Sequence, residues 1–169
     1  MRIGLIILLM GIVIPLSGCG SNSSTAQGVT QEVPQPRQHS QQTDDWASNA
    51  SIAINEFTKA DNMVINSMKE MGAGKIDNHT FVNQLNSQLI LLNKAITNVN
   101  YRRVSDPSAN RIRQELDASF GDYDLAVKHL MQGAMLSNSS AVNNAVQQLT
   151  SSQKESEQAI KDFKRYMAN

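Results

Sequence analysis

The sequence predicts an all-α protein, and two observations support this prediction. Aromatic residues make up only 5% of the chain, whereas a β-sandwich would be rich in Val, Ile, Thr, Tyr and Phe between regular turn signals. Apolar residues recur at alternating spacings of three and four along four stretches, as on one face of an α-helix. The single cysteine excludes an intramolecular disulfide scaffold and a cysteine-based zinc site. We therefore expect four amphipathic helices in one modest domain of a 169-residue chain.

The first predicted helix begins at Thr43-Asp44-Asp45, because Thr and Asp are favoured at helix N-caps. It ends at Gly72-Ala73-Gly74, where glycine can adopt the left-handed conformation. Asp77 or Asn78 then caps a second helix. The first stripe contains Trp46, Ala50, Ala53, Phe57, Ala60, Val64, Met68 and Met71, and the second contains Phe81, Leu85, Leu89, Leu92, Ile96 and Val99, broadened by Val82, Ile90 and Leu91.

Asp106-Pro107 starts the third predicted helix, since Asp is a favoured cap and proline suits the first helical turn. The cluster of capping residues at 136–140, Leu-Ser-Asn-Ser-Ser, separates it from a fourth helix. The third stripe contains Ile112, Leu116, Tyr123, Val127, Leu130 and Ala134, and the fourth contains Val142, Ala145, Leu149, Ser152, Ser156, Ala159, Phe163 and Met167.

The short connections between these stretches predict an antiparallel up-down-up-down four-helix bundle. Each stripe alone is too weak to hold an isolated helix, so the helices must pack together. Ser152 and Ser156 weaken the fourth stripe, and we expect their hydroxyls to bond to the preceding turn. A three-helix core with a loosely packed fourth helix is therefore the alternative architecture.

The N-terminus has the parts of an export signal. Met1-Arg2 precedes an apolar run from Ile3 to Pro15, which is too short to span a bilayer comfortably. Leu16-Ser17-Gly18-Cys19 resembles the bacterial lipobox, and this resemblance implies that the Cys19 thiol carries diacylglycerol and that Cys19 becomes the new N-terminus. With further acylation, as by palmitate, two or more chains anchor a protein stably, because each buried methylene contributes about 0.8 kcal/mol.

The predicted organisation is therefore a lipoprotein signal peptide at residues 1–18, a lipidated cysteine with a disordered tether at 19–42, and a helical bundle domain at 43–169. The tether is rich in Ser, Asn, Thr and Gln with Pro34 and Pro36, so it buries too little surface to offset its ordering entropy. Its expected reach is roughly 25 Å. Residue 20 is Gly, unlike the Asp of the inner-membrane retention signal of diderm bacteria.

This reasoning predicts a secreted protein, lipid-anchored on the extracytoplasmic face of the cell membrane, or on the outer membrane if the organism is diderm. The mature chain is similar in general style to small helical lipoproteins of Gram-positive bacteria, including the turn Gly74-Lys75-Ile76-Asp77. That similarity assigns a role to Cys19 alone.

No residue pattern predicts catalysis, so we expect a protein that is not an enzyme and has no metal or cofactor. His39, His79 and His129 lack a carboxylate or second histidine at converging spacing. Asp122 and Asp124 lie two apart on a helix and point to different sides, while Tyr123 between them is expected in the core with its hydroxyl at the edge. The methionines at helical spacing, Met63, Met68, Met71, Met131 and Met135, are typical of flexible core filler.

Charge placement suggests one contact surface. Fifteen basic and fifteen acidic residues cancel, which argues against a nucleic-acid partner bound by bulk electrostatics. An up-down-up-down bundle would gather Arg102, Arg103, Arg111, Arg113, Lys161, Lys164 and Arg165 at its tethered end. The helix macrodipole accounts for cations at helix C-termini, but not for Arg111 and Arg113 in the opening turns of a helix. We therefore predict contact of this end with anionic headgroups or wall polymers.

Three functions remain open from the sequence. The first is a non-enzymatic binding or scaffold protein of the cell envelope, which offers its distal end or a groove to an envelope protein. The second is a carrier of a small ligand or haem in a pocket between helices, lined by residues such as Phe57, Leu89 and Tyr123. The third is a surface exclusion or immunity factor.

Overall fold

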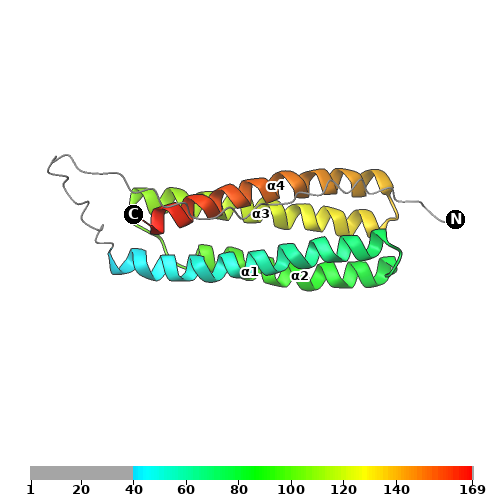
Figure 1. Cartoon of the computed structure of the whole chain (residues 1–169), viewed down its shortest axis with the longest axis horizontal. Coiled ribbons are helices and arrows are strands. Elements are labelled where there is room, and N and C mark those ends of the chain that lie inside the picture. The colour runs from blue at the N-terminus through cyan, green and yellow to red at the C-terminus, as the bar shows by residue number, and fades with distance from the viewer. Residues whose placement is uncertain (1–39, 169) are drawn as a thin grey trace, which may run out of the picture.

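A computed structural model describes residues 40–168, and this part of the chain is built from four α-helices without strands. The helices are α1 (Gln41–Gly72), α2 (Asn78–Val99), α3 (Pro107–Met135) and α4 (Ser139–Met167), shown in Figure 1. The predicted all-α class with four helices is confirmed. The predicted signal peptide, Cys19 and the tether up to residue 39 lie outside the described residues.

The helices pack as two neighbouring pairs. In Figure 1, α1 lies beside α2 and α3 lies beside α4. The α3–α4 and α1–α2 contacts are the most extensive, α2 also packs along α3, and α1 meets α3 at few positions. Because α4 takes part in the most extensive contact of the bundle and buries residues from Ala145 to Tyr166, the alternative of a loosely packed fourth helix is not favoured.

The N-caps follow the sequence at three helices and differ at one. Asp77, Asp106 and Asn138 cap α2, α3 and α4. α1, however, begins at Gln41 with Ser40 as its N-cap, two residues before the predicted start at Thr43. Thr43 is already helical and buried, and its backbone N–H donates to Ser40 Oγ at 3.3 Å.

Two C-termini end in the same six-residue turn. After α1, the Lys75 N–H donates to the Glu70 carbonyl at 2.9 Å, with Gly74 in the left-handed region at φ 65°. After α3, the Asn138 N–H donates to the Gly133 carbonyl at 2.9 Å, and Ser137 adopts φ 51°. This pattern is the Schellman motif, which satisfies the last carbonyls of a helix. It makes both turns short and internally bonded.

The core follows the predicted stripes closely, with three corrections. Ile90, expected to broaden the α2 stripe, is 58% exposed, because it lies one residue, about 100° of helix rotation, beyond Leu89. At the end of α4, Tyr166 is buried and the predicted Met167 is 45% exposed. Phe120, which the stripe of α3 omits, is fully buried.

Aromatic rings fill the centre of the bundle. Phe57 of α1 stacks on Phe120 of α3 with ring centroids 4.1 Å apart, and it makes a T-shaped contact with Tyr123, with ring centroids 5.1 Å apart. Aromatic pairs contribute about 0.5–1.5 kcal/mol beyond the area they bury. These contacts join α1 to α3 across the bundle, where the backbones themselves meet little.

A glycine sets the closest approach of two helices. Gly133 lies in the last turns of α3, and a Cβ atom built on it would lie 2.9 Å from the backbone nitrogen of Val142 in α4. Backbone cannot move aside as a flexible side chain can. Gly121, also in α3, has no atom outside its own stretch of helix backbone within 4 Å of the same built position, and it offers a matched control.

We expect Gly133→Ala to lower the free energy of unfolding by about 1–3 kcal/mol, because the added methyl forces α4 away from α3. Gly121→Ala should instead raise it by about 0.5–1 kcal/mol, since alanine loses less conformational entropy within a helix. Urea denaturation followed by circular dichroism measures both. Equal effects of the two substitutions would contradict a close α3–α4 contact at Gly133.

Candidate functional site: the two ends of the bundle

Trp46 brings three helix termini together at one end of the bundle. Its indole Nε1–H donates to the Val99 carbonyl at the end of α2 at 3.2 Å, and its ring meets that of Phe163, near the end of α4, edge-on at 5.7 Å. The indole is completely buried. We call this the entry end, defined by the first turn of α1, residues 100–106 and the last two turns of α4.

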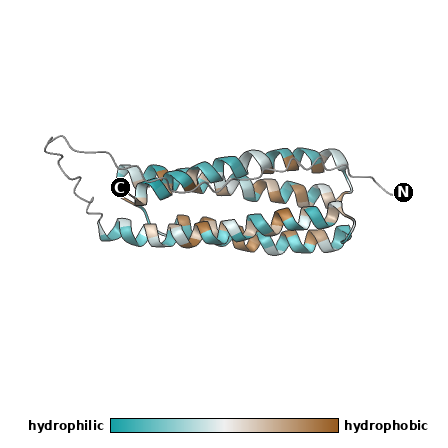
Figure 2. Ribbon diagram, viewed as in Figure 1, coloured by the Kyte–Doolittle hydropathy of each residue, from teal (hydrophilic) through white to brown (hydrophobic). Residues whose placement is uncertain are grey.

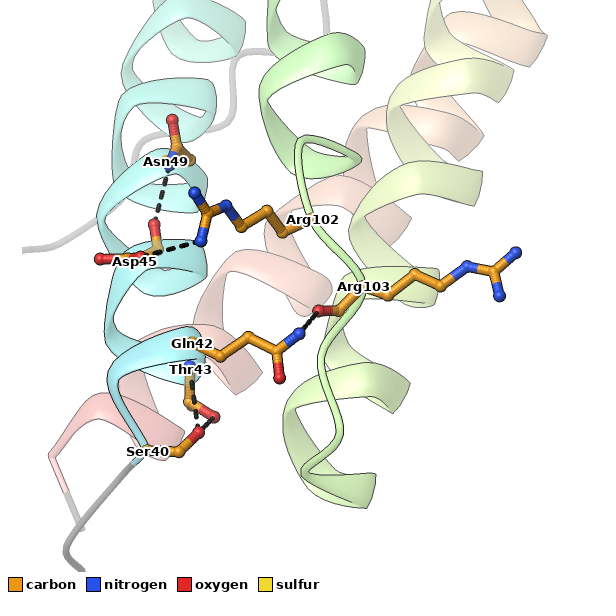
Figure 3. A network of polar contacts seen from close by, with 7 residues as sticks. All are labelled: Ser40, Gln42, Thr43, Asp45, Asn49, Arg102 and Arg103. Atoms are coloured by element: carbon orange, nitrogen blue, oxygen red, sulfur yellow. Dashed lines mark hydrogen bonds and ion pairs between the residues drawn. The ribbon is translucent and has the colours of Figure 1, made fainter.

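Polar contacts hold the loop after α2 against the first turn of α1 (Figure 3). Gln42 Nε2 donates to the Arg103 carbonyl at 2.7 Å, and Gln42 Oε1 accepts from the Ser105 hydroxyl at 3.4 Å. Arg102 forms an ion pair with Asp45 at 3.2 Å. These residues are more than fifty positions apart in sequence, so the loop is fixed by tertiary contacts to α1.

The seven predicted basic residues lie at or near the entry end, and four of them have protein partners. Besides the Arg102–Asp45 pair, Arg111 lies 3.7 Å from Glu115, and Arg165 lies 3.2 Å from Asp162. Arg113 donates to the side-chain carbonyls of Asn100 at 2.6 Å and Asn110 at 3.3 Å. These bonds give a local reason for Arg111 and Arg113 in the opening turns of α3, where the macrodipole does not favour them.

The other three basic residues are Arg103, Lys161 and Lys164, which are exposed and have no side-chain partner among residues 40–168. In Figure 3 the Arg103 guanidinium points away from the contacts that its own carbonyl makes with Gln42. Tyr101 is 59% exposed at the same end. Its ring centroid lies 5.6 Å from the guanidinium carbon of Arg102. The free cations are thus fewer than the sequence pattern suggests.

The described histidines and core methionines, from which no ligand site was expected, make ordinary side-chain contacts. His79 Nδ1 lies 3.2 Å from the Asn83 amide, and His129 Nδ1 lies 2.8 Å from Gln148 Oε1. His39 lies outside the described residues. Within those residues no three His, Cys, Asp or Glu side chains gather as metal ligands. Met68, Met71 and Met131 pack against the core.

A carboxylate that the sequence analysis missed joins three helices. Asp61 of α1 accepts hydrogen bonds from the Tyr123 hydroxyl of α3 at 2.7 Å and from Gln153 Nε2 of α4 at 3.3 Å. Burial raises the pKa of Asp61, opposed by the bond from Tyr123, and the charge of Glu157 raises it further. Burial, followed by the charge of Asp61, raises the pKa of Tyr123, so its hydroxyl remains a donor. Tyr123 is in the core with its hydroxyl at the edge, as predicted.

The two serines of the α4 stripe differ in the hydrogen bonding of their hydroxyls. Ser152 Oγ donates to the Gln148 carbonyl one turn earlier at 2.9 Å, as expected. Ser156 is also fully buried, but its hydroxyl has no partner in the described part of the chain, so the expectation is wrong for this residue. The buried Asp124 pairs with Lys128 at 2.6 Å, whereas Asp122 is exposed.

The opposite end, which we call the far end, is formed by the α1–α2 and α3–α4 turns. Asn78 at the start of α2 donates to the Ala134 carbonyl near the end of α3 at 3.4 Å. Met135 and Leu136 are 64% and 76% exposed there. The Schellman turn at Ser137 holds this apolar pair outward. None of the four described helices is long and apolar enough to cross a membrane.

We expect the buried Asp61 to make stability fall with rising pH. Its folded-state pKa is raised, so the folded state retains a proton that the unfolded state has lost, and the stabilisation present below pH 3.8 disappears as pH rises through the folded-state pKa. Asp61→Asn removes this dependence and keeps an acceptor for Tyr123. Measured by urea denaturation, the stability of the variant relative to the wild type should therefore increase as pH rises above 3.8.

Asp77→Asn is the control of opposite sign. Hydrogen bonds from Thr80 lower the pKa of Asp77, so this carboxylate stabilises the fold above its unfolded-state value and loses that effect as pH falls through its lower folded-state pKa. The Asp77→Asn variant should lose stability relative to the wild type as pH rises toward 3.8. If the stabilities of both variants relative to the wild type changed in the same direction with pH, the opposite pKa shifts assigned to Asp61 and Asp77 would be contradicted.

Comparison of the chain with models of known protein families, with curated proteins and with solved structures finds no match. The function is therefore inferred from the described residues and from the motif that ends at Cys19.

Proposed function

We propose that this protein is a lipid-anchored, non-enzymatic scaffold on the extracytoplasmic face of a bacterial membrane. The anchoring rests on the lipobox-like Leu16-Ser17-Gly18-Cys19. The orientation rests on the position of Ser40 at the entry end, where Trp46 and the Gln42 contacts fix the start of α1. Only about twenty residues separate Ser40 from Cys19 in the sequence, a reach of roughly 25 Å if flexible. Lipid on Cys19 therefore holds the entry end toward the bilayer.

The proposed topology is the antiparallel up-down-up-down bundle. Contacts between the start of one helix and the end of the next support it, namely Trp46 with Val99 and Asn78 with Ala134. The contact of Trp46 with Phe163 likewise pairs the start of α1 with the end of α4. In this topology the far end projects away from the membrane by the length of α1, roughly 48 Å for its 32 residues.

Each end has its own proposed role. The unpaired cations Arg103, Lys161 and Lys164 face anionic headgroups or wall polymers, where each basic residue contributes about 1 kcal/mol near a charged surface. Met135 and Leu136 at the far end are available to an envelope protein. Their exposure of 64% and 76% supports this role, because methionine is over-represented at protein interfaces.

The anchoring proposal is tested by mass spectrometry of the protein purified from membranes. We expect loss of residues 1–18 and a diacylglyceryl and acyl mass on Cys19, together with incorporation of labelled palmitate. Cys19→Ala should abolish labelling and leave the signal segment attached. An unmodified Cys19 thiol in the wild-type protein would overturn the proposal.

The headgroup contact is tested with the mature polypeptide carrying Cys19→Ser. Because this variant bears no acyl chain, its binding to vesicles reports the protein surface alone. Replacing Arg103, Lys161 and Lys164 with Gln should weaken binding to phosphatidylglycerol vesicles at least about tenfold at low salt, because three headgroup attractions are lost. The matched control replaces Lys69, Lys75 and Lys154 with Gln. It changes the net charge by the same amount, but at residues away from the entry end. Equal losses in both triple variants would indicate bulk charge and exclude a headgroup-binding end.

A further inference from the structure

Tyr101 differs from every other aromatic residue of the chain in its exposure. The four Phe, three Tyr and one Trp of the sequence all lie within residues 40–168. All of them except Tyr101 are at most 7% exposed, whereas Tyr101 is 59% exposed. A single exposed apolar side chain is ordinary on a protein surface, so the meaning of this exposure depends on where Tyr101 lies.

Tyr101 lies in the loop of the entry end, two residues after the end of α2. Its backbone N–H donates to the Asn98 carbonyl at 3.4 Å. The bond from Gln42 to the Arg103 carbonyl holds the same loop against α1, and Val104 is buried. Contacts on both sides therefore fix the loop backbone, while the side chain of Tyr101 remains on the surface.

A second exposed apolar side chain lies at the same end. Met167 is the last residue of α4 and is 45% exposed. It follows Phe163 by about one turn, and the Phe163 ring meets Trp46, so the end of α4 lies beside the start of α1 (Figure 1). Figure 2 shows hydrophilic colouring over much of the second half of α4. Exposed Met167 is thus an apolar exception on a polar helix end.

The charges of the entry end suit an anionic bilayer. One of the three unpaired cations, Arg103, is only two residues from Tyr101. Two carboxylates of this end lie at helix N-termini, Asp44 in the first turn of α1 and Asp106 at the N-cap of α3. The positive ends of the helix macrodipoles offset their charge. The other carboxylates of this end are the ion-pair partners described above, so the charges left without a local counterpart are positive.

The chemistry of tyrosine suits the boundary between water and lipid. Its ring is apolar and its hydroxyl is polar, and tyrosine is enriched at membrane–water interfaces, where the ring lies at the level of the headgroups. We propose that Tyr101, together with Met167, enters the headgroup layer of the membrane in which Cys19 is anchored. The bundle then stands on the bilayer instead of hanging from its tether.

The position of the anchor favours a bilayer over a wall polymer, and this step rests on the proposed function. About twenty residues separate Cys19 from Ser40, so lipid on Cys19 keeps the entry end within roughly 25 Å of the membrane. Confinement at this distance raises the effective concentration of headgroups around Tyr101. One exposed ring beside a few cations is then sufficient for docking, although it would bind weakly from free solution.

Quenching by brominated lipids tests whether residue 101 reaches the bilayer. Acylated protein with Tyr101→Trp is placed in phosphatidylglycerol vesicles brominated near the headgroup end of the acyl chains, and the emission of the wild type, with its buried Trp46, is subtracted. Ile90→Trp is the matched control, because Ile90 is 58% exposed but lies about 14 Å before the end of α2. Quenching should be at least about threefold stronger for Tyr101→Trp, because its indole would lie at the headgroups.

Vesicle affinity tests whether the ring contributes to docking. In the mature polypeptide with Cys19→Ser, Tyr101→Ala should weaken binding to phosphatidylglycerol vesicles about fivefold, because the apolar area that the ring would bury is lost. Tyr101→Trp should retain the binding, and Ile90→Ala should leave it unchanged. Both positions are exposed, so the variants should fold as the wild type does, which circular dichroism verifies.

Equal quenching of Tyr101→Trp and Ile90→Trp, or an unchanged vesicle affinity of Tyr101→Ala, would exclude docking through Tyr101. Binding to isolated cell walls that depends on Tyr101, without quenching in vesicles, would exclude it as well and assign the ring to a wall polymer. Failure of the anchoring proposal is recognised separately, because the mass spectrum then shows an unmodified Cys19 thiol, whereas the affinity measurement uses a chain that bears no acyl group.

Discussion

The burial of one indole ring fixes where the start of α1 meets the ends of α2 and α4. Trp46 lies only a few residues after the start of α1, yet its ring is fully buried and contacts both the end of α2 and the end of α4. Without that contact the first turns of α1 would fray, as helix ends do when nothing packs on them. Because Trp46 is fixed, α1 begins at a defined place in the bundle. The entry end can therefore be distinguished from the far end.

The fold was predictable because its signals are local and repeated. The apolar spacing defines which face of each helix is buried, and the caps at Asp77 and Asp106 lie immediately before the helices that they start. Both signals depend on neighbours within a few positions, which a sequence displays directly. The start of α1 is different, because Ser40 and Thr43 are both suitable caps. Gln42 bonds to residues of a distant loop, and such long-range support of an earlier start is absent from the local pattern.

The site was predictable only in outline. The basic residues do gather near one end, but their pairing with Asp45, Glu115 and Asp162 depends on side-chain geometry that spacing alone does not give. Asp61 was missed because a charged residue beside an apolar stripe is ordinarily solvated. Its partners come from α3 and α4, so it could be recognised only after the helices were assembled.

The two ends of the bundle would respond differently to salt. The proposed contacts of Lys161 and Lys164 with anionic headgroups would be screened by mobile ions, over a Debye length of about 10 Å at 0.1 M and less at higher salt. Apolar and amide contacts are not weakened in this way, and strongly hydrated salts can strengthen apolar burial. If the protein lies outside the cytoplasm, as proposed, it meets whatever fluid surrounds the cell. Apolar contacts of Met135 and Leu136 with a partner would then persist from fresh water to seawater, whereas the proposed contact of the entry end with the bilayer would weaken as the salt concentration rises.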